Sequence, residues 1–323
     1  MIEAQRLKGV PMLDDGALTS DRKADFTWIY NQPDPRAYFR TLNDLEYQVP
    51  QQALPIFEAV LAASVREGRP RTVLDVCCSY GINAALLRCE VDLGEIGARC
   101  TDTERAALPP DELIKADAEF YAHRLRRPDL AVLGLDVSAP AIDYAVRAGL
   151  LARGWAEDLE TSDPSPALAA GVRDVGVIIC TGGVGYVGPR TFDRLLRAIG
   201  DPHGLWLAIF VLRVFAYDEI ADTFARYGLV TERMPGLTFR QRRFADPEEF
   251  EAANHDVVLR GLDPTGKEAE GWYGTTPTVS SPARQPQLRR HRLPSYLPEF
   301  CPMAVDERLA SHRPRWCPAE RVP

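Results

Sequence analysis

The chain has 323 residues, of which 46% are hydrophobic and 26% charged, and its formal net charge at pH 7 is −8. This composition is typical of a globular protein, and the acidic balance argues against a nucleic acid as partner. No apolar run approaches the roughly 18 residues of a membrane span, and the charged start MIEAQRLKGVPMLDDG is not a signal peptide, so we expect no membrane partner and a cytoplasmic location.

Residues 1–70 are polar and aromatic, and we expect them to form a helical cap, or lid, over the rest of the protein. Apolar residues recur at helical spacing in QQALPIFEAVLAASVREG, residues 51–68. Gly68 and Pro70 are typical of the end of such a helix.

Residues 71–281 alternate strand-like and helix-like segments, and the strands are apolar on both faces. This alternation predicts a mostly parallel sheet covered by helices on both sides, which is a doubly wound α/β fold. The predicted strands are residues 72–76, 131–137, 174–180 and 205–213, with a fifth from 229, and the helices between them are residues 82–90, 139–151, 190–200 and 217–229.

The distance from Gly81 to Asp136 is 55 positions, whereas a helix and a turn need roughly 20 to 25. The excess includes PPDELIKADAEFYAHRLRR, residues 109–127, an amphipathic helix. We therefore predict a helical insertion over about residues 91–128.

Two segments compete for the last strand of the sheet. One is LTFRQRR, residues 237–243, and the other is GWYGTTPTVS, residues 271–280, after a predicted helix over 246–262. Gly274 and Pro277 make the second segment a poor strand. Residues 282–323 contain eight Pro and eight Arg, which predicts an irregular, loosely ordered tail.

The loop after the first predicted strand, from Cys77 to Gly81, reads Cys-Cys-Ser-Tyr-Gly. Ligands of open α/β sheets bind at such strand ends. A dinucleotide pyrophosphate favours G-x-G-x-x-G there, because the backbone must approach the phosphates closely. Cys77 and Ser79 stand at the first two glycine positions, which disfavours a dinucleotide.

The pattern V-L-D-x-x-C-x-x-G-x-x-x-x-x-L, from Val73 to Leu87, resembles motif I of class I SAM-dependent methyltransferases. The resemblance covers about residues 50–235. It implies a Rossmann-like methyltransferase fold, with a seven-stranded sheet that ends in an antiparallel hairpin, and S-adenosylmethionine (SAM) as cofactor. It further implies that the loop cradles the methionine part of SAM. The implied cofactor contacts are Asp75, Cys77, Cys78, Ser79 and Gly81.

The resemblance also assigns residues at the ends of later strands. Asp136, followed by Val137, matches the acid that binds the ribose hydroxyls, although NAD enzymes carry an acid there too. Glu157 or Asp158 matches the acid near the adenine. The segment Thr181–Tyr186 follows the fourth strand of the family and would line the methyl-transfer centre, with Thr181 and Gly182 also on the cofactor.

Substrate contacts are expected from the lid, where Tyr30, Tyr38 and Tyr47 offer aromatic faces for a sulfonium and Arg36 offers a clamp for a carboxylate. Arg213, at the end of the fifth strand, is a candidate for substrate charge, and Thr181, Tyr186 and Arg213 are the candidate catalytic residues.

The histidines and cysteines give no further site. None of the five histidines lies in a motif loop, and the seven cysteines form no C-x-x-C pair and no Cys/His cluster. We therefore expect reduced thiols and no metal site.

The sequence thus predicts a SAM-dependent methyltransferase acting on a small-molecule acceptor. The acceptor atom, which could be oxygen, nitrogen or carbon, stays open, and the arginines favour a carboxylate- or hydroxyl-bearing metabolite. Two alternatives remain: a SAM-binding protein without transferase activity, and a NAD(P)-dependent oxidoreductase. The oligomeric state is not predicted.

Overall fold

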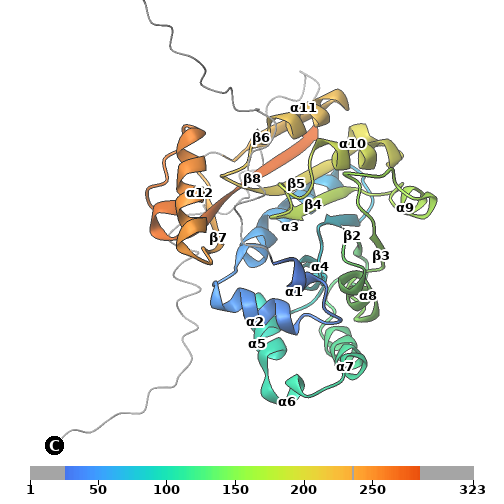
Figure 1. The fold of residues 1–323 in the computed structure, drawn as a ribbon. Helices are drawn as coiled ribbons and strands as arrows, with labels where there is room; N and C mark the ends of the chain where they lie inside the picture. The colour runs from blue at the N-terminus through green and yellow to red at the C-terminus, as the bar shows by residue number, and fades with distance from the viewer. Residues whose placement is uncertain (1–25, 235, 284–323) are drawn as a thin grey trace, which may run out of the picture.

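The computed structural model describes residues 26–234 and 236–283. Its centre is an eight-stranded sheet of order β3-β2-β1-β4-β5-β8-β6, in which β7 pairs with β8 outside this path (Figure 1). The first five strands in this order are parallel, and β8 runs antiparallel between β5 and β6. The strands are β1 (Thr72–Val76), β2 (Ala131–Asp136), β3 (Arg153–Ala156), β4 (Val177–Thr181), β5 (Trp206–Leu212), β6 (Leu229–Arg233), β7 (Phe239–Arg243) and β8 (Trp272–Pro282).

Helices cover both faces of the sheet because its strands are apolar on both sides (Figure 1). In β1, Val73 faces one core, whereas Leu74 and Val76 face the other. The first core is closed by α3 (Val49–Arg66), α4 (Ile82–Arg88) and α8 (Ala139–Arg147), and the second by α9 (Pro166–Gly171), α10 (Pro189–Ala198) and α11 (Asp218–Arg226). The predicted doubly wound α/β fold is confirmed.

The sheet differs from the prediction at its two edges. At one edge β3 is a strand that the sequence analysis did not assign, because its four residues are partly exposed and carry no apolar run. At the other edge both candidates for the last strand are strands, and the apparently poor one is β8, which pairs along its length with β5.

Pro277 is tolerated in β8 because of its place in the pairing. It faces Phe210 of β5 on one side, and on the other side it falls between the residues that pair with β6 and those that pair with β7. The missing N–H therefore leaves no neighbouring acceptor without a partner. Gly274 is required, since a Cβ there would lie 2.6 Å from Oε1 of Glu268.

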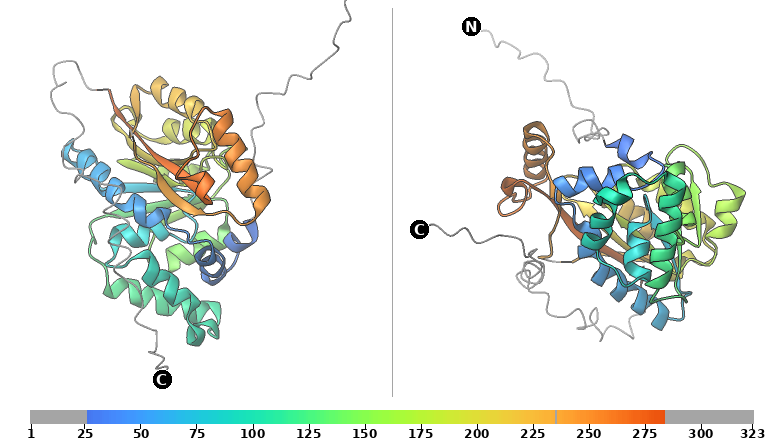
Figure 2. Two further views of the ribbon diagram at one scale, coloured as in Figure 1. Left: turned by 90° about the vertical axis from the view of Figure 1, so that its left-hand side faces the viewer. Right: turned by 90° about the horizontal axis from the view of Figure 1, so that it is seen from below.

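The helices outside the two layers form a group below the sheet. α1 (Thr27–Tyr30) and α2 (Arg36–Asp44) precede α3, and the insertion contains α5 (Leu93–Thr101), α6 (Thr103–Ala106) and α7 (Pro110–His123). Figures 1 and 2 show α2 beside α5, so the insertion supports the N-terminal helices. α12 (Pro247–Leu259) packs at the side of the sheet, near β7 (Figure 1).

The domain limits given above stay predictions. Residues 1–25 of the lid, and the tail from residue 284 onward, lie outside the described residues. Within the described ranges, no helix combines the length and the apolar character that crossing a bilayer demands.

Candidate functional site

The loop after β1 follows the backbone path of a glycine-rich turn although two of its glycines are replaced. Cys77, Ser79 and Gly81 have φ angles of 59°, 49° and 77°. These left-handed conformations cost non-glycine residues on the order of 1 kcal/mol each. Cys77 and Ser79 stand at the first two glycine positions of the G-x-G-x-x-G pattern, so the replacement changes the side chains and keeps the turn.

A pocket of about 190 Å³ lies beyond the carboxyl ends of β1, β2 and β4, where this loop begins. Most of the predicted site residues line it, which the parallel strands explain, since their ends meet at one edge. The predicted residues that line the pocket are Tyr30, Tyr38, Tyr47, Cys77, Cys78, Ser79, Asp136, Val137, Glu157, Asp158, Thr181, Gly182 and Tyr186.

Asp136 attaches the loop from Cys77 to Gly81, called the motif loop below, to the end of β2. Its Oδ2 accepts the Ser79 N–H at 2.8 Å, and its Oδ1 accepts the Ser138 N–H at 2.9 Å. Burial raises the pKa of Asp136, and these backbone donors oppose the rise. A carboxylate offers about four acceptor positions, so Asp136 retains capacity for donors of a ligand.

Three polar atoms on the pocket wall are buried with no hydrogen-bond partner among the described residues. They are Oγ of Ser79, Oδ1 of Asn83 and Oγ1 of Thr191. An unpaired buried polar atom costs about 1–3 kcal/mol. A ligand with matching polar groups removes this cost, so the wall is prepared for a polar ligand.

Asp75 and Gly81 do not line the pocket, but they support residues that do. Gly81 is the N-cap of α4. Asp75 is fully buried and accepts Nδ2 of Asn83 at 3.1 Å, and the same nitrogen donates to Oγ1 of Thr181 at 3.1 Å. Asn83 was missed by the sequence analysis. Its signal was a lone amide in the apolar helix INAALL.

Asp75→Asn is expected to remove a pH dependence of stability. Burial raises the pKa of Asp75 from 3.8 to about 8. Between these values the folded state keeps a proton that the unfolded state loses, so the free energy of unfolding falls as the pH rises to about 8. At pH 8 the variant should be more stable than wild type by at least about 1 kcal/mol, with a smaller difference at pH 5. Urea denaturation at both pH values measures this, and equal slopes in the two proteins would contradict it.

The acids after β3 are tied down by nearby hydrogen bonds. Glu157 accepts the N–H and the hydroxyl of Ser165 at 2.8 and 2.6 Å. Asp158 accepts the Glu160 N–H at 2.9 Å. Glu160, which the sequence analysis did not single out, accepts the Gly188 N–H at 2.7 Å and so fixes the loop that follows β4.

The lid tyrosines pack edge to face above the motif loop. The ring of Tyr38 lies 5.6 Å from Tyr30, 6.1 Å from Tyr47 and 5.9 Å from Tyr80 between centroids. The Tyr80 hydroxyl lies 2.8 Å from the Ile29 carbonyl, to which it donates, and it accepts the Gln32 N–H at 3.1 Å. The motif loop therefore holds the N-terminal helices in place.

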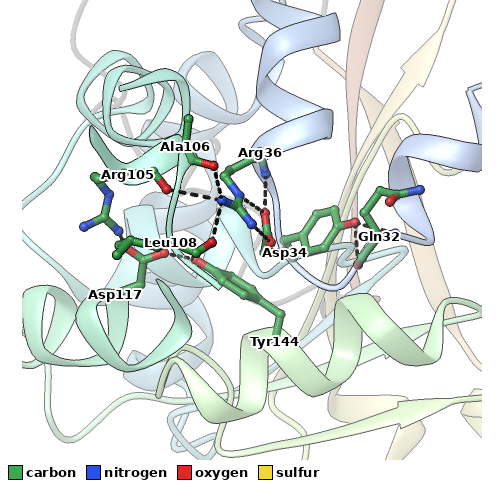
Figure 3. Close-up of polar contacts among 9 residues, drawn as sticks. Gln32, Asp34, Arg36, Arg105, Ala106, Leu108, Asp117 and Tyr144 are labelled. Carbon is green, nitrogen blue, oxygen red and sulfur yellow. Dashed lines mark hydrogen bonds and ion pairs between the residues drawn. The ribbon is translucent and has the colours of Figure 1, made fainter. Parts of the chain in front are cut away.

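Arg36 does not point into the pocket, contrary to the prediction. Its guanidinium pairs with Asp34 at 2.7 Å and donates to the carbonyls of Arg105, Ala106 and Leu108 (Figure 3). It therefore joins α2 to the insertion. Beside it, Asp117 accepts the Tyr144 hydroxyl at 2.9 Å and pairs with Arg105 (Figure 3).

Arg213 is also placed away from the pocket. It is 9% exposed, and its guanidinium donates to Glu268 at 2.6 Å and to the Asp263 carbonyl at 2.7 Å. Neither of these two predicted substrate-binding arginines lines the pocket, because each is paired with another part of the chain. Within the described part of the chain, no three His, Cys, Asp or Glu side chains group as metal ligands.

No protein-family model and no curated protein matches the chain. Solved structures match at low identity. A SAM-dependent methyltransferase from Aquifex aeolicus is 14% identical, with 80% of this chain and 99% of that chain covered and a TM-score of 0.38. A TehB-like SAM-dependent methyltransferase from Corynebacterium glutamicum is 16% identical, with 69% and 87% covered and a TM-score of 0.34. The plantazolicin methyltransferase BamL, solved with a triazolic desmethylPZN analog and S-adenosylhomocysteine (SAH), is 12% identical, with 80% and 94% covered and a TM-score of 0.38.

The fold itself is read from the strand order. A parallel sheet of order β3-β2-β1-β4-β5 is completed by an antiparallel β8 inserted before β6. The motif loop that predicted this arrangement lies at the carboxyl edge of the sheet, in the pocket wall. The chain thus has the Rossmann-like methyltransferase fold.

Proposed function

We propose that the chain binds SAM in the pocket beyond β1, β2 and β4 and transfers its methyl group to a small-molecule acceptor. The observation that carries the proposal is the charge of the pocket. Among the described residues, its lining contains Asp136, Glu157 and Asp158 and no Arg, Lys or His. SAM carries a sulfonium and an ammonium against one carboxylate, whereas a dinucleotide brings a pyrophosphate that such a lining repels.

The polar groups at the carboxyl edge of the sheet match successive parts of the SAM molecule. Asp136 would accept the ribose hydroxyls, and Glu157 or Asp158 would lie near the adenine. The unpaired Oγ of Ser79 and Oδ1 of Asn83 would meet the amino-acid end, since one can donate to a carboxylate and the other can accept from an ammonium.

Bound SAM supplies a methyl group already activated on sulfur, so the chain mainly has to align and enclose the reactants. Gly182 and Gly183 line the pocket, and neither position has room for a side chain, because a Cβ there would lie 2.5 Å from Nε2 of Gln241 and 2.6 Å from Sγ of Cys180. The Thr181 hydroxyl accepts a hydrogen bond from Nδ2 of Asn83 at 3.1 Å, and Thr181, Asn83 and Tyr47 line the same pocket. The tyrosine faces exclude water and attract positive charge.

The pocket favours an uncharged or cationic acceptor over a carboxylate. The carboxylate preference depended on arginines of the lid, whereas Arg36 is paired with Asp34 and the described lining of the pocket contains no arginine. A strong base is also absent from the described lining, since burial raises the pKa of Tyr47 to about 12 and that of Tyr30 above its usual range. The nucleophile is then one that needs no strong base, such as a neutral amine or an acidic phenol.

Calorimetric titration of the full chain with SAH, SAM, NAD⁺ and NADP⁺ tests the cofactor. We expect SAH and SAM to bind with a Kd of about 100 µM or tighter, in the usual range for a working ligand, and the nicotinamide dinucleotides not to bind. Binding of NAD⁺ or NADP⁺ without SAH would replace the proposal with an oxidoreductase.

Release of SAH from SAM with panels of aromatic amines, phenols and aromatic carboxylates tests the acceptor. We expect turnover with amines or phenols. Turnover restricted to carboxylates would reject the acceptor class and keep the cofactor. SAH binding without turnover in any panel would favour a SAM-binding protein that is not a transferase.

A further inference from the structure

A second cavity, of about 340 Å³, lies where β5, β6 and β8 meet the segment after α12. Among the described residues it shares no lining residue with the pocket beyond β1, β2 and β4. Phe215 lines the second cavity, and its ring packs against Gly185 in the loop after β4. The second cavity is therefore a separate feature of the fold.

The second cavity is basic, in contrast to the acidic pocket. Its described lining contains Arg213, Arg233, Arg260 and Lys267 against Asp263 alone. This concentration of positive charge stands in a chain whose net charge is −8, so it does not follow from the general composition. A concave wall of one charge raises the local concentration of ions of opposite charge.

Two of these cations already form ion pairs with carboxylates, and the two ion pairs differ in strength. Arg213 is neutralised by Glu268, whose side chain is fully buried, at 2.6 Å. Arg233 lies 3.9 Å from Asp218, and 52% of its side chain and 83% of that of Asp218 are exposed, so this pair is weak.

Arg260 has no ion-pair partner among the described residues, and unlike Lys267 it has a buried nitrogen without a hydrogen-bond partner. It caps the C-terminal end of α12, and its side chain forms no ion pair or hydrogen bond among the described residues. Its Nε is buried with no partner. Burial and the nearby charge of Arg233 lower the pKa of Arg260, and the charge of Asp218 offsets this only in part, so the positive charge of Arg260 is poorly accommodated as the structure stands.

The rest of the wall is largely apolar, with Phe215, Leu237 and Leu262 near these cations. Guanidinium groups match the paired oxygens of carboxylates and phosphates. We propose that this cavity binds a small organic anion, with its carboxylate or phosphate head between Arg233 and Arg260 and its apolar body against Leu237 and Leu262. The anion supplies the counter-charge and the acceptor that Arg260 lacks.

Calorimetric titration of the full chain with phenyl phosphate, benzoate, inorganic phosphate and benzyl alcohol tests the site. We expect saturable binding of phenyl phosphate or benzoate at about 1 mM or tighter, as a small fragment allows, and weaker binding of inorganic phosphate and of the neutral alcohol. Which of the two aromatic anions binds more tightly identifies the head group. A wild-type chain that binds neither overturns the proposal.

Variants then locate the binding. Arg260→Gln and Arg233→Gln should each weaken it at least about tenfold, whereas Arg153→Gln, an exposed arginine at the opposite edge of the sheet, should leave it unchanged. The ligand-free melting temperature of Arg260→Gln should equal or exceed that of wild type, because the substitution removes an unpaired charge. Binding that persists in Arg260→Gln, or a lowered melting temperature of its ligand-free form, overturns the proposal.

Discussion

Asp136→Ala is expected to weaken the binding of SAH by about 1–3 kcal/mol, which is roughly 5- to 150-fold in Kd. The carboxylate would lose its charge-assisted bonds to the ribose hydroxyls. The substitution also leaves the N–H groups of Ser79 and Ser138 without their acceptor, so the loop after β1 loses its attachment to β2. Both losses act on the same ligand, because Ser79 and Asp136 line one pocket. Isothermal titration with SAH measures the change.

Two further variants separate these causes. Asp136→Asn keeps an acceptor oxygen and the size of the side chain while removing the charge, so it should fall between Asp136→Ala and wild type. Asp143→Asn, on the exposed side of α8, removes a carboxylate close in sequence and should bind SAH as wild type does. If Asp136→Ala binds SAH with unchanged affinity, the ribose does not sit at the end of β2.

Glu249→Ala is expected to lower the free energy of unfolding by about 3–5 kcal/mol, because it leaves a buried guanidinium without its counter-ion. Arg242 and Glu249 are 2% and 1% exposed and are joined by two hydrogen bonds, of 2.8 and 2.6 Å. The Arg242 guanidinium also lies 5.1 Å from the ring of Phe26 and 4.9 Å from that of Tyr273. The pair therefore connects β7, α12 and the residue before α1. Urea denaturation measures the loss.

The matched control is Asp143→Ala, which breaks the exposed pair with Arg147 and should leave the urea midpoint within experimental error. The double variant Arg242→Met, Glu249→Leu removes both charges and should recover most of the stability lost in Glu249→Ala. A midpoint for Glu249→Ala close to that of Asp143→Ala would show that the guanidinium finds water or another partner.

Local patterns were enough to predict the central sheet and much of the candidate pocket. An apolar strand such as residues 72–76 has to be covered on both faces, so its sequence carries the parallel architecture with it. Once the strands are parallel, their carboxyl ends meet at one edge, and the loop from Cys77 to Gly81, Asp136 and Thr181 must lie together there. The left-handed backbone of Cys77 and Ser79 was not predicted and became visible only in the structure.

The sequence could not determine the partners of long charged side chains or the pairing of the last strands. Arg36 and Arg213 looked available, yet Arg36 binds carbonyls about 70 positions away and Arg213 binds Glu268, 55 positions away. Pro277 looked like a strand breaker until its place between the β6 and β7 pairings was known. Hydrophobic periodicity is a local property of the chain and was readable in advance. The partner of a charge or of a strand edge depends on which distant segments the fold brings near it, and only the tertiary structure decides that.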